Sequence, residues 1–151
     1  MAKIICTVTN DLSYDQRMIR ICSSLAKAGY EVLLIGRQLP TSTPLQQQIF
    51  QQKRIICRFN KGKLFYLEYN LRLFILFFQQ PFDLLCAVDL DTLLPTFLWS
   101  RFRQKPLIYD AHEYFTEVPE VVDRPLTKAI WSTLAQLIIP QVQSAYTVGP
   151  R

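Results

Sequence analysis

The sequence predicts a single α/β domain with a Rossmann-like, doubly wound and mostly parallel sheet. Short apolar runs rich in β-branched residues alternate with segments of helical spacing along the 151 residues. Strands that are covered on both faces read as continuous apolar runs, and a strand–helix–strand alternation builds parallel sheets. Half of the residues are hydrophobic, which is enough to cover both faces of such a sheet. The length corresponds to about one domain, so we assign residues 1–151 to it.

The first strand–helix–strand unit is the best defined. Residues 3–9 (KIICTVT) form one apolar run, and residues 31–36 (EVLLIG) form another. Between them, residues 15–28 carry apolar side chains at positions 18, 21, 22 and 25 and polar side chains on the other side, as an amphipathic helix does. Asp15 can cap this helix and Gly29 can end it. Such units are right-handed and place their two strands in parallel.

The remaining elements continue the alternation. Residues 38–52 are mostly polar, contain two prolines and predict a loop. Apolar runs bounded by turn residues predict strands, and apolar residues at helical spacing predict helices. The predicted strands are 54–59, 83–88, 106–109 and 144–148, and the predicted helices are 64–79, 93–103 and 127–139.

Composition and charge restrict the partners and the compartment. The formal net charge of +5 favours anionic partners such as nucleotide phosphates, acidic lipid surfaces or nucleic acid. The sequence opens without a signal-peptide pattern, and its longest apolar stretch, residues 73–78, is far shorter than the ~20 residues of a spanning helix. Cys6, Cys22, Cys57 and Cys86 are far apart and lack metal-binding spacing, so we predict buried free thiols in a reducing cytosol. We therefore expect a cytoplasmic protein.

Polar side chains follow three of the predicted strands. In an open parallel sheet, ligands bind outside the carboxyl ends of the strands, so these side chains are candidates for a binding site. They are Asn10, Asp11 and Ser13 after the first strand, Asp89, Asp91 and Thr92 after the fourth, and Asp110, His112 and Glu113 after the fifth. His112 is the only histidine, and an imidazole can accept or donate a proton at neutral pH.

Simpler roles compete with binding at these positions. Asp11, Asp15, Asp89 and Asp91 are of a residue type that caps helices, and a lone histidine is often structural. The spacing Asp89-x-Asp91 is only a weak signal for a metal ion. The sequence lacks GxGxxG, GxxxxGK[ST] and GxSxG motifs, which argues against dinucleotide, P-loop and α/β-hydrolase chemistry.

A basic and aromatic region allows two kinds of partner. Arg54, Arg58, Lys61 and Lys63 lie near aromatic residues, as in nucleic-acid-binding surfaces. The order of elements matches no nucleic-acid-binding module, so we expect no nucleic-acid partner. Residues 64–78 (LFYLEYNLRLFILFF) place an apolar, aromatic surface beside the basic turn, which favours peripheral contact with the inner face of the membrane. The alternative is that these side chains pack on the sheet.

Three segments resemble the N-terminal domain of GT-B glycosyltransferases of family 4, also called group 1. Residues 11–37 (DLSYDQRMIRICSSLAKAGYEVLLIGR) resemble the family's first helix and second strand, with an Asp-x-Arg stretch ahead of LAKAGYEV. Residues 82–95 (FDLLCAVDLDTLLP) resemble its hDhhhxxDxDTLxP element, in which h is apolar. Residues 105–121 (KPLIYDAHEYFTEVPEV) resemble its hhYDxHExxxE element, and the ending SAYTVGP resembles the strand that closes this domain.

The resemblance implies roles for the candidate residues. His112 matches the cleft histidine near the transferred sugar, and Asp110 and Glu113 would support it or contact acceptor hydroxyls. The loop NDLSYD has no glycine where many relatives have glycines, which argues against a close backbone approach to a phosphate there. The other matches are Asn10 and Asp11 in the first-strand loop, Asp89 and Asp91 in the acceptor-side loop, and Arg17 in the first-helix motif.

The resemblance also implies an activity. This domain would form the acceptor side of an enzyme that transfers a sugar from a nucleotide-sugar donor to a glycan or lipid-linked acceptor, with retention at the anomeric carbon and without a metal or other cofactor. The family's C-terminal donor-binding domain, with its Glu-x7-Glu motif, is absent from this chain. We therefore expect the domain alone to be inactive and, with its interdomain face exposed, to self-associate. The alternative is a non-catalytic Rossmann-like module that binds a sugar or nucleotide or docks on a membrane.

Overall fold

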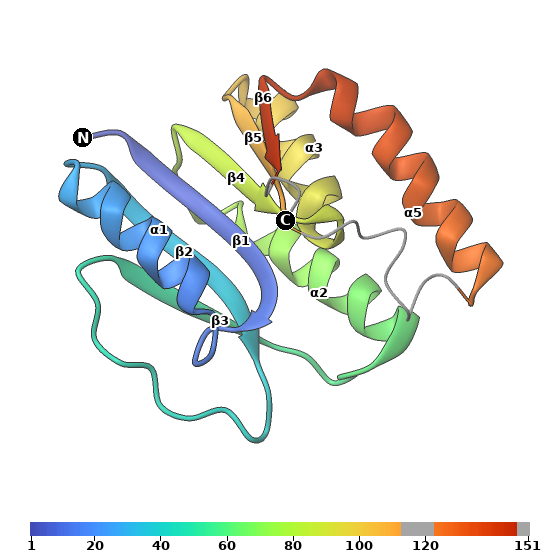
Figure 1. Cartoon of the computed structure of the whole chain (residues 1–151), viewed down its shortest axis with the longest axis horizontal. Coiled ribbons are helices and arrows are strands. Elements are labelled where there is room, and N and C mark those ends of the chain that lie inside the picture. The colour runs from blue at the N-terminus through green and yellow to red at the C-terminus, as the bar shows by residue number, and fades with distance from the viewer. Residues whose placement is uncertain (113–122, 148–151) are drawn as a thin grey trace.

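The chain forms one six-stranded parallel sheet in the order β3-β2-β1-β4-β5-β6 (Figure 1). The structure, a computed structural model, describes residues 1–112 and 123–147. The direction of strand addition reverses between β1 and β4, which is the point where open α/β sheets bind ligands. The strands are β1 (Lys3–Asp11), β2 (Glu31–Gln38), β3 (Gln51–Ile56), β4 (Leu84–Val88), β5 (Leu107–Ala111) and β6 (Ser144–Thr147).

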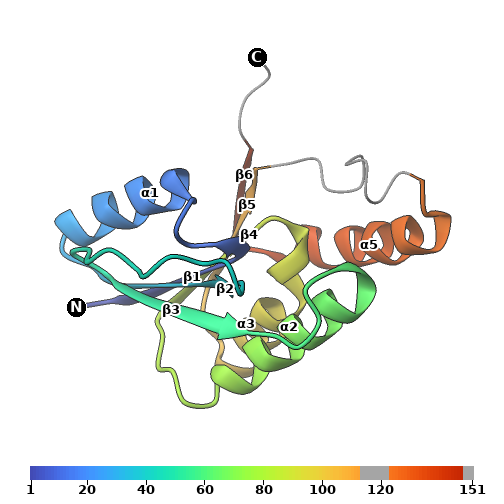
Figure 2. The ribbon, with the colours of Figure 1, turned by 90° about the horizontal axis from the view of Figure 1, so that it is seen from below.

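Helices cover both faces of the sheet, as a doubly wound fold requires. Figure 2 shows α1 on one side of the sheet and α2, α3 and α5 on the other. The helices are α1 (Gln16–Lys27), α2 (Gly62–Leu76), α3 (Leu93–Arg103) and α5 (Pro125–Ile138), with single 3-10 turns η1 (Leu90–Thr92) and η3 (Ile139–Gln141). The predicted fold class is confirmed. Within the described residues, no helix is both long enough and apolar enough to cross a bilayer.

The buried strands carry two separate hydrophobic clusters. Successive residues of a strand point to opposite faces, so Ile4 and Cys6 of β1 pack toward α1 while Ile5 packs toward α2, α3 and α5. The four cysteines are buried and free, as predicted. The continuous apolar run at the start of the chain therefore reflects a strand with a core on each side.

The first helix begins and ends where the sequence predicts. The Asp15 carboxylate accepts a hydrogen bond of 3.0 Å from the backbone N–H of Met18, which is an N-cap. Gly29 follows the helix with a positive φ of 96°, a conformation that favours glycine. These two residues fix the length of the connection between β1 and β2.

The third strand lies three residues earlier than the sequence predicts. The expected strand was 54–59, whereas β3 spans Gln51–Ile56 and pairs Gln51 with Leu33 of β2. The difference arises because β3 is an edge strand with a polar, half-exposed pattern, which gives little apolar signal at its start. The predicted last strand reached residue 148, which lies outside the described residues.

Gly36 lets the loop after β1 cross close to β2. A Cβ atom at this position would lie 2.3 Å from Leu12 Cδ2 and 2.8 Å from the backbone oxygen of Asn10. Leu12 is itself buried, so its side chain cannot move into solvent. The glycine therefore sets how near the end of β1 lies to the end of β2.

Gly36→Ala is expected to lower the free energy of unfolding by about 1–3 kcal/mol, because the added methyl group overpacks this contact. Urea unfolding measures the change, with Ser24→Ala on the exposed side of α1 as a control that should change it by less than about 0.5 kcal/mol. An unchanged unfolding midpoint in the glycine variant would contradict the close contact.

Glu68 of α2 holds the segment that follows β3. Its carboxylate accepts hydrogen bonds from the backbone N–H groups of Arg58 (2.9 and 3.0 Å) and Phe59 (3.0 Å) and from Arg72 Nε (2.8 Å). These hydrogen bonds, first that from Arg58, lower the pKa of Glu68 from 4.5 to about 2.

Glu68→Gln is expected to weaken the acid dependence of stability. Because the pKa of Glu68 in the folded chain lies below its ordinary value, the ionised carboxylate stabilises the fold above pH 4.5, and this contribution is lost as the pH falls toward 2. Urea midpoints measured across this range should fall less steeply in the glutamine variant than in the wild type. Identical slopes in the two proteins would refute the role of Glu68.

Candidate functional site at the carboxyl edge of the sheet

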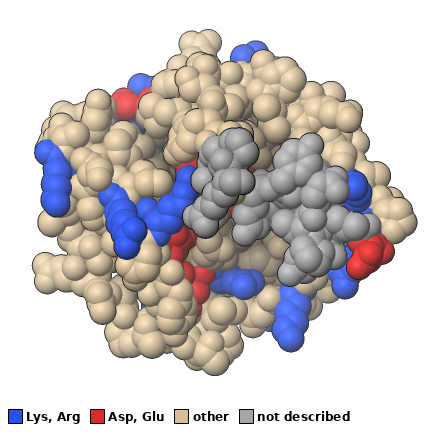
Figure 3. All heavy atoms as spheres, viewed as in Figure 1, with Lys and Arg blue, Asp and Glu red and all other residues tan. Residues whose placement is uncertain are grey.

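A cleft of about 510 Å³ lies where α1 and the ends of β1, β2 and β5 meet. Its lining brings together four of the predicted residues, Asn10, Asp11, Arg17 and His112, and adds Tyr14, Asp15, Gln16 and Arg37. Figure 3 shows this face: Lys and Arg side chains gather over α1, and Asp and Glu side chains lie close beside them. Strand ends that are far apart in sequence thus form one site, as the fold predicts.

Asp110 is the buried partner of Arg17, one of the residues that line the cleft. It lies at the end of β5, its side chain is fully buried, and its two carboxylate oxygens lie 2.6 and 2.7 Å from Nη2 of Arg17. The Tyr146 hydroxyl of β6 donates a third hydrogen bond of 2.8 Å to the same carboxylate. One buried charge therefore connects α1, β5 and β6, and it holds the guanidinium of Arg17, a residue that lines the cleft.

The titration behaviour of the partners of Asp110 follows from this contact. Partial burial alone would lower the pKa of Arg17, but the hydrogen bond and the charge of Asp110 outweigh it and raise that pKa. Burial, together with Cys86 and the nearby carboxylate, raises the pKa of the Tyr146 hydroxyl above its ordinary value. Arg17 thus stays charged and Tyr146 stays a hydrogen-bond donor at neutral pH.

Asp89 fixes the position of His112 through a hydrogen bond to the backbone of the histidine. The Asp89 carboxylate accepts a hydrogen bond of 2.8 Å from the backbone N–H of His112, and the Asp89 N–H donates to the backbone oxygen of Asp110 at 2.8 Å. Asp89 has φ 60° and ψ 176°, a region that is otherwise almost confined to glycine. The strained residue lets the loop after β4 reach the end of β5. Its carboxylate holds the histidine and does not cap η1.

The other predicted acids serve contacts inside the protein. Asp11 lines the cleft, but its oxygens accept hydrogen bonds from Ser13 N–H (3.0 Å), Ser42 Oγ (2.6 Å) and Arg54 Nη2 (3.2 Å). Burial raises the pKa of Asp11, yet these hydrogen bonds and the Arg54 charge outweigh it, so the pKa is lowered. Asp91 is buried and accepts a hydrogen bond from the Thr9 hydroxyl.

Arg37 is a site residue that the sequence interpretation missed. It follows the buried part of β2, and its guanidinium lies 4.1 Å from the centre of the Phe65 ring of α2. Nη1 donates to the backbone oxygen of Asn60 at 3.2 Å, while the buried Nε finds no acceptor among the described residues. The signal was available, because the rule that selected the ends of the other strands applies equally to β2. The predicted Glu113 lies outside the described residues.

A second hollow, of about 400 Å³, lies between β3 and α2. Its lining is both polar and apolar and contains none of the predicted site residues: it consists of Arg54, Ile55, Ile56, Arg72, Ile75, Leu76 and Gln79. In the described part of the chain, no three His, Cys, Asp or Glu side chains are grouped in a way that could hold a metal ion. The cleft at the carboxyl edge is therefore the candidate site.

Comparison with known proteins places the fold. No protein-family model and no curated protein matches the sequence. Solved structures do match: sucrose-phosphate synthase from Thermosynechococcus elongatus has a TM-score of 0.67 and 13% identity over 96% of this chain and 42% of its own. HepE from Anabaena, solved with UDP and glucose, has a TM-score of 0.58 and 15% identity over 98% of this chain and 44% of its own.

The fold is that found in GT-B glycosyltransferases. A protein of Listeria monocytogenes assigned as a UDP-N-acetylglucosamine 2-epimerase shares it, with a TM-score of 0.52 and 10% identity over 97% of this chain and 38% of its own. The chain thus spans less than half the length of each of these three proteins. At these identities the likeness defines the fold, and any activity must be argued from the cleft.

The loss of stability on breaking the ion pair between Arg17 and Asp110 should depend on which partner is replaced. Arg17→Met leaves the fully buried Asp110 charge without its partner and should cost about 3–5 kcal/mol of stability. Asp110→Asn leaves a guanidinium whose side chain is 27% exposed and can reach water, so its cost should be smaller, about 2 kcal/mol.

Urea unfolding at neutral pH measures both variants, and Tyr146→Phe provides a control that removes only one hydrogen bond, at about 1 kcal/mol. Equal costs for the two charge variants, or a larger cost for the asparagine variant, would contradict the assignment of Asp110 as the more deeply buried member of the pair.

Proposed function

We propose that the chain is the acceptor-side part of a glycosyltransferase that transfers a sugar from a nucleotide-sugar donor to a glycan or lipid-linked acceptor. The observation that carries the proposal is the position of His112. The only imidazole of the chain lines the cleft at the carboxyl edge of the sheet, beside Arg17, Asn10 and Arg37. This edge is where the fold binds ligands, and the fold itself is that of sugar-nucleotide enzymes.

The chemistry of sugar transfer suits this set of side chains. Departure of the nucleoside diphosphate leaves an electron-poor, oxocarbenium-like sugar, and catalysis depends on hydrogen-bond groups placed in advance around it. His112 would bond the transferred sugar near the reacting carbon. Its backbone is already held by Asp89, so little reorganisation is needed on binding. Arg17 would donate to acceptor or sugar hydroxyls, and the Asn10 amide, which donates one N–H to Asp15 Oδ2 at 3.0 Å, would offer its other N–H.

Groups outside this chain would complete the reaction. The chain covers 42% and 44% of the two glycosyltransferases compared. From the resemblance to family 4 we infer that the donor's base and diphosphate bind largely to a second domain, and that the chain alone is inactive. The resemblance to family 4 favours retention at the anomeric carbon and a reaction that needs no metal ion. The stereochemistry of the product, read by proton NMR on the anomeric signal, would test the first of these points.

His112→Ala is expected to lower kcat for sugar transfer by about 100-fold or more, since it removes one placed hydrogen-bond group from the transition state. The measurement uses the complete gene product and a panel of sugar nucleotides, with folding checked by circular dichroism. Tyr30→Phe is the matched control, because this exposed aromatic residue precedes β2 at the opposite end of the sheet.

Two results would overturn the proposal. Full activity in the histidine variant would return His112 to a structural role. Binding of a sugar nucleotide without transfer, in wild type and variant alike, would favour the alternative of a non-catalytic binding module.

A further inference from the structure

One face of the molecule carries an apolar stripe that no described segment covers. On α2 and the turn after it, exposed side chains recur every three or four residues, so they lie on one side of the helix. Two exposed side chains of the neighbouring α3 extend the stripe. We define the apolar face as Leu64, Leu67, Leu71, Ile75 and Phe78 with Leu98 and Phe102.

The most exposed part of the apolar face is held rigidly. Phe78 and Phe102 are 64% and 78% exposed, and each packs edge-on against Trp99, with ring centres 4.7 and 5.4 Å apart. Trp99 is buried, and its indole N–H donates to the Phe74 backbone oxygen at 2.9 Å. Two phenyl rings thus project from a fixed aromatic base, so little side-chain entropy would be lost when they are buried.

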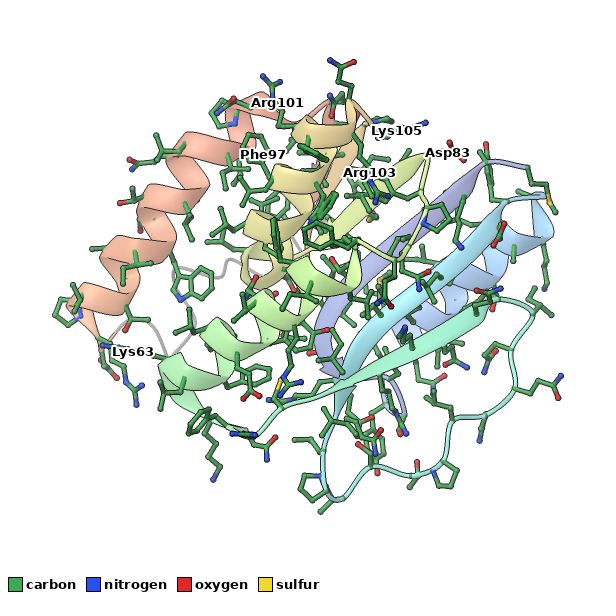
Figure 4. The ribbon with its side chains drawn as sticks, turned by 180° about the vertical axis from the view of Figure 1, so that it is seen from behind. Lys63, Asp83, Phe97, Arg101, Arg103 and Lys105 are labelled. Atoms are coloured by element: carbon green, nitrogen blue, oxygen red, sulfur yellow. The ribbon has the colours of Figure 1, made fainter. Side chains whose placement is uncertain are left out.

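Basic side chains border the apolar face at both ends. Figure 4 shows this side of the molecule, with Lys63 at one end of α2 and Arg101 near the end of α3. Lys105, which follows α3, is paired with Asp83 at 3.1 Å and adds no net charge. Within α2 and α3 the basic residues are Lys63, Arg72, Arg101 and Arg103, and the one acidic residue is Glu68. Glu68 is engaged by Arg72 and by the backbone near Arg58, so the exposed field is positive.

This combination of charge and apolar surface selects the partner. A second copy of the chain would oppose basic ends to basic ends, which costs free energy. A bilayer with anionic headgroups satisfies both features, because basic groups contact the headgroups while aromatic side chains enter the interfacial region. We propose that the apolar face is a membrane-docking surface for anionic lipid. This inference is independent of sugar transfer and can fail or succeed without it.

Vesicle co-sedimentation of the full chain tests the proposal. The chain should bind vesicles of equal parts phosphatidylglycerol and phosphatidylcholine and should not bind pure phosphatidylcholine. Phe78→Gln with Phe102→Gln should weaken binding at least roughly tenfold. Lys63→Gln with Arg101→Gln should weaken it about fivefold for each removed charge, or roughly 25-fold together.

Control variants make the same kinds of change in other parts of the surface, and the charge control removes the same number of charges as the variant it is compared with. Ile49→Gln replaces an exposed apolar residue in the loop between β2 and β3, and Arg20→Gln with Lys27→Gln removes two exposed charges from α1. Both should leave vesicle binding within about twofold of wild type. Urea midpoints check that every variant is folded.

Three outcomes would overturn the proposal. If Arg20→Gln with Lys27→Gln weakens vesicle binding as much as Lys63→Gln with Arg101→Gln does, the binding is a non-specific attraction of a basic protein to anionic lipid. Equal binding of all variants to both kinds of vesicle would show that the apolar face is not the docking surface. Sedimentation velocity could show that the wild type forms concentration-dependent dimers. If Phe78→Gln with Phe102→Gln abolishes these dimers while vesicle binding persists, the apolar face serves self-association.

Discussion

The buried charge of Asp110 is the constraint on which the site depends. A carboxylate without solvent must be compensated, and the partners come from α1, 93 residues away, and from β6, 36 residues away. A buried ion pair adds little net stability, but loss of one partner is costly. The pair therefore acts mainly on geometry: α1 cannot shift along the sheet without exposing this charge, and the cleft keeps its shape.

The acidic residues around the site form hydrogen bonds and ion pairs with other residues of the protein. Asp110 holds Arg17, Asp89 holds the backbone of His112, Asp11 engages Ser42 and Arg54, and Asp91 engages Thr9. The abundance of acids beside the only histidine suggested carboxylates that face a sugar. These acids contact other parts of the protein, the Arg17 guanidinium and the His112 imidazole line the cleft, and the Asn10 amide donates to Asp15 at 3.0 Å. A hydroxyl-rich ligand would meet donors that acids hold in position, together with the carboxylates of Asp11 and Asp15.

Sequence predicted the fold well because buried parallel strands and amphipathic helices leave local patterns, as at α1, whose cap and end were both found. It misplaced β3, where an edge strand has little apolar signal. The rule of strand ends brought Asn10 and His112 to one edge and the family resemblance added Arg17, yet neither could say which acid each arginine would contact. That choice depends on packing between residues 43 and 93 positions apart, which no local pattern encodes. No pattern in the sequence predicted the positive φ of Asp89 either.

The cleft is connected with the helix that carries the apolar face. Arg37 lines the cleft and lies over the ring of Phe65, a buried residue in the first turns of α2, and the Tyr69 hydroxyl of α2 donates to the Val8 backbone oxygen of β1. The outer side of the same helix carries Leu64 and Leu67. If α2 lies on a bilayer, α2 and the sheet lie between the headgroups and the face of the sheet that α1 covers. If both proposals hold, membrane docking would concentrate lipid-linked acceptors around the protein and would favour them over free glycans by proximity, without any added contact in the cleft.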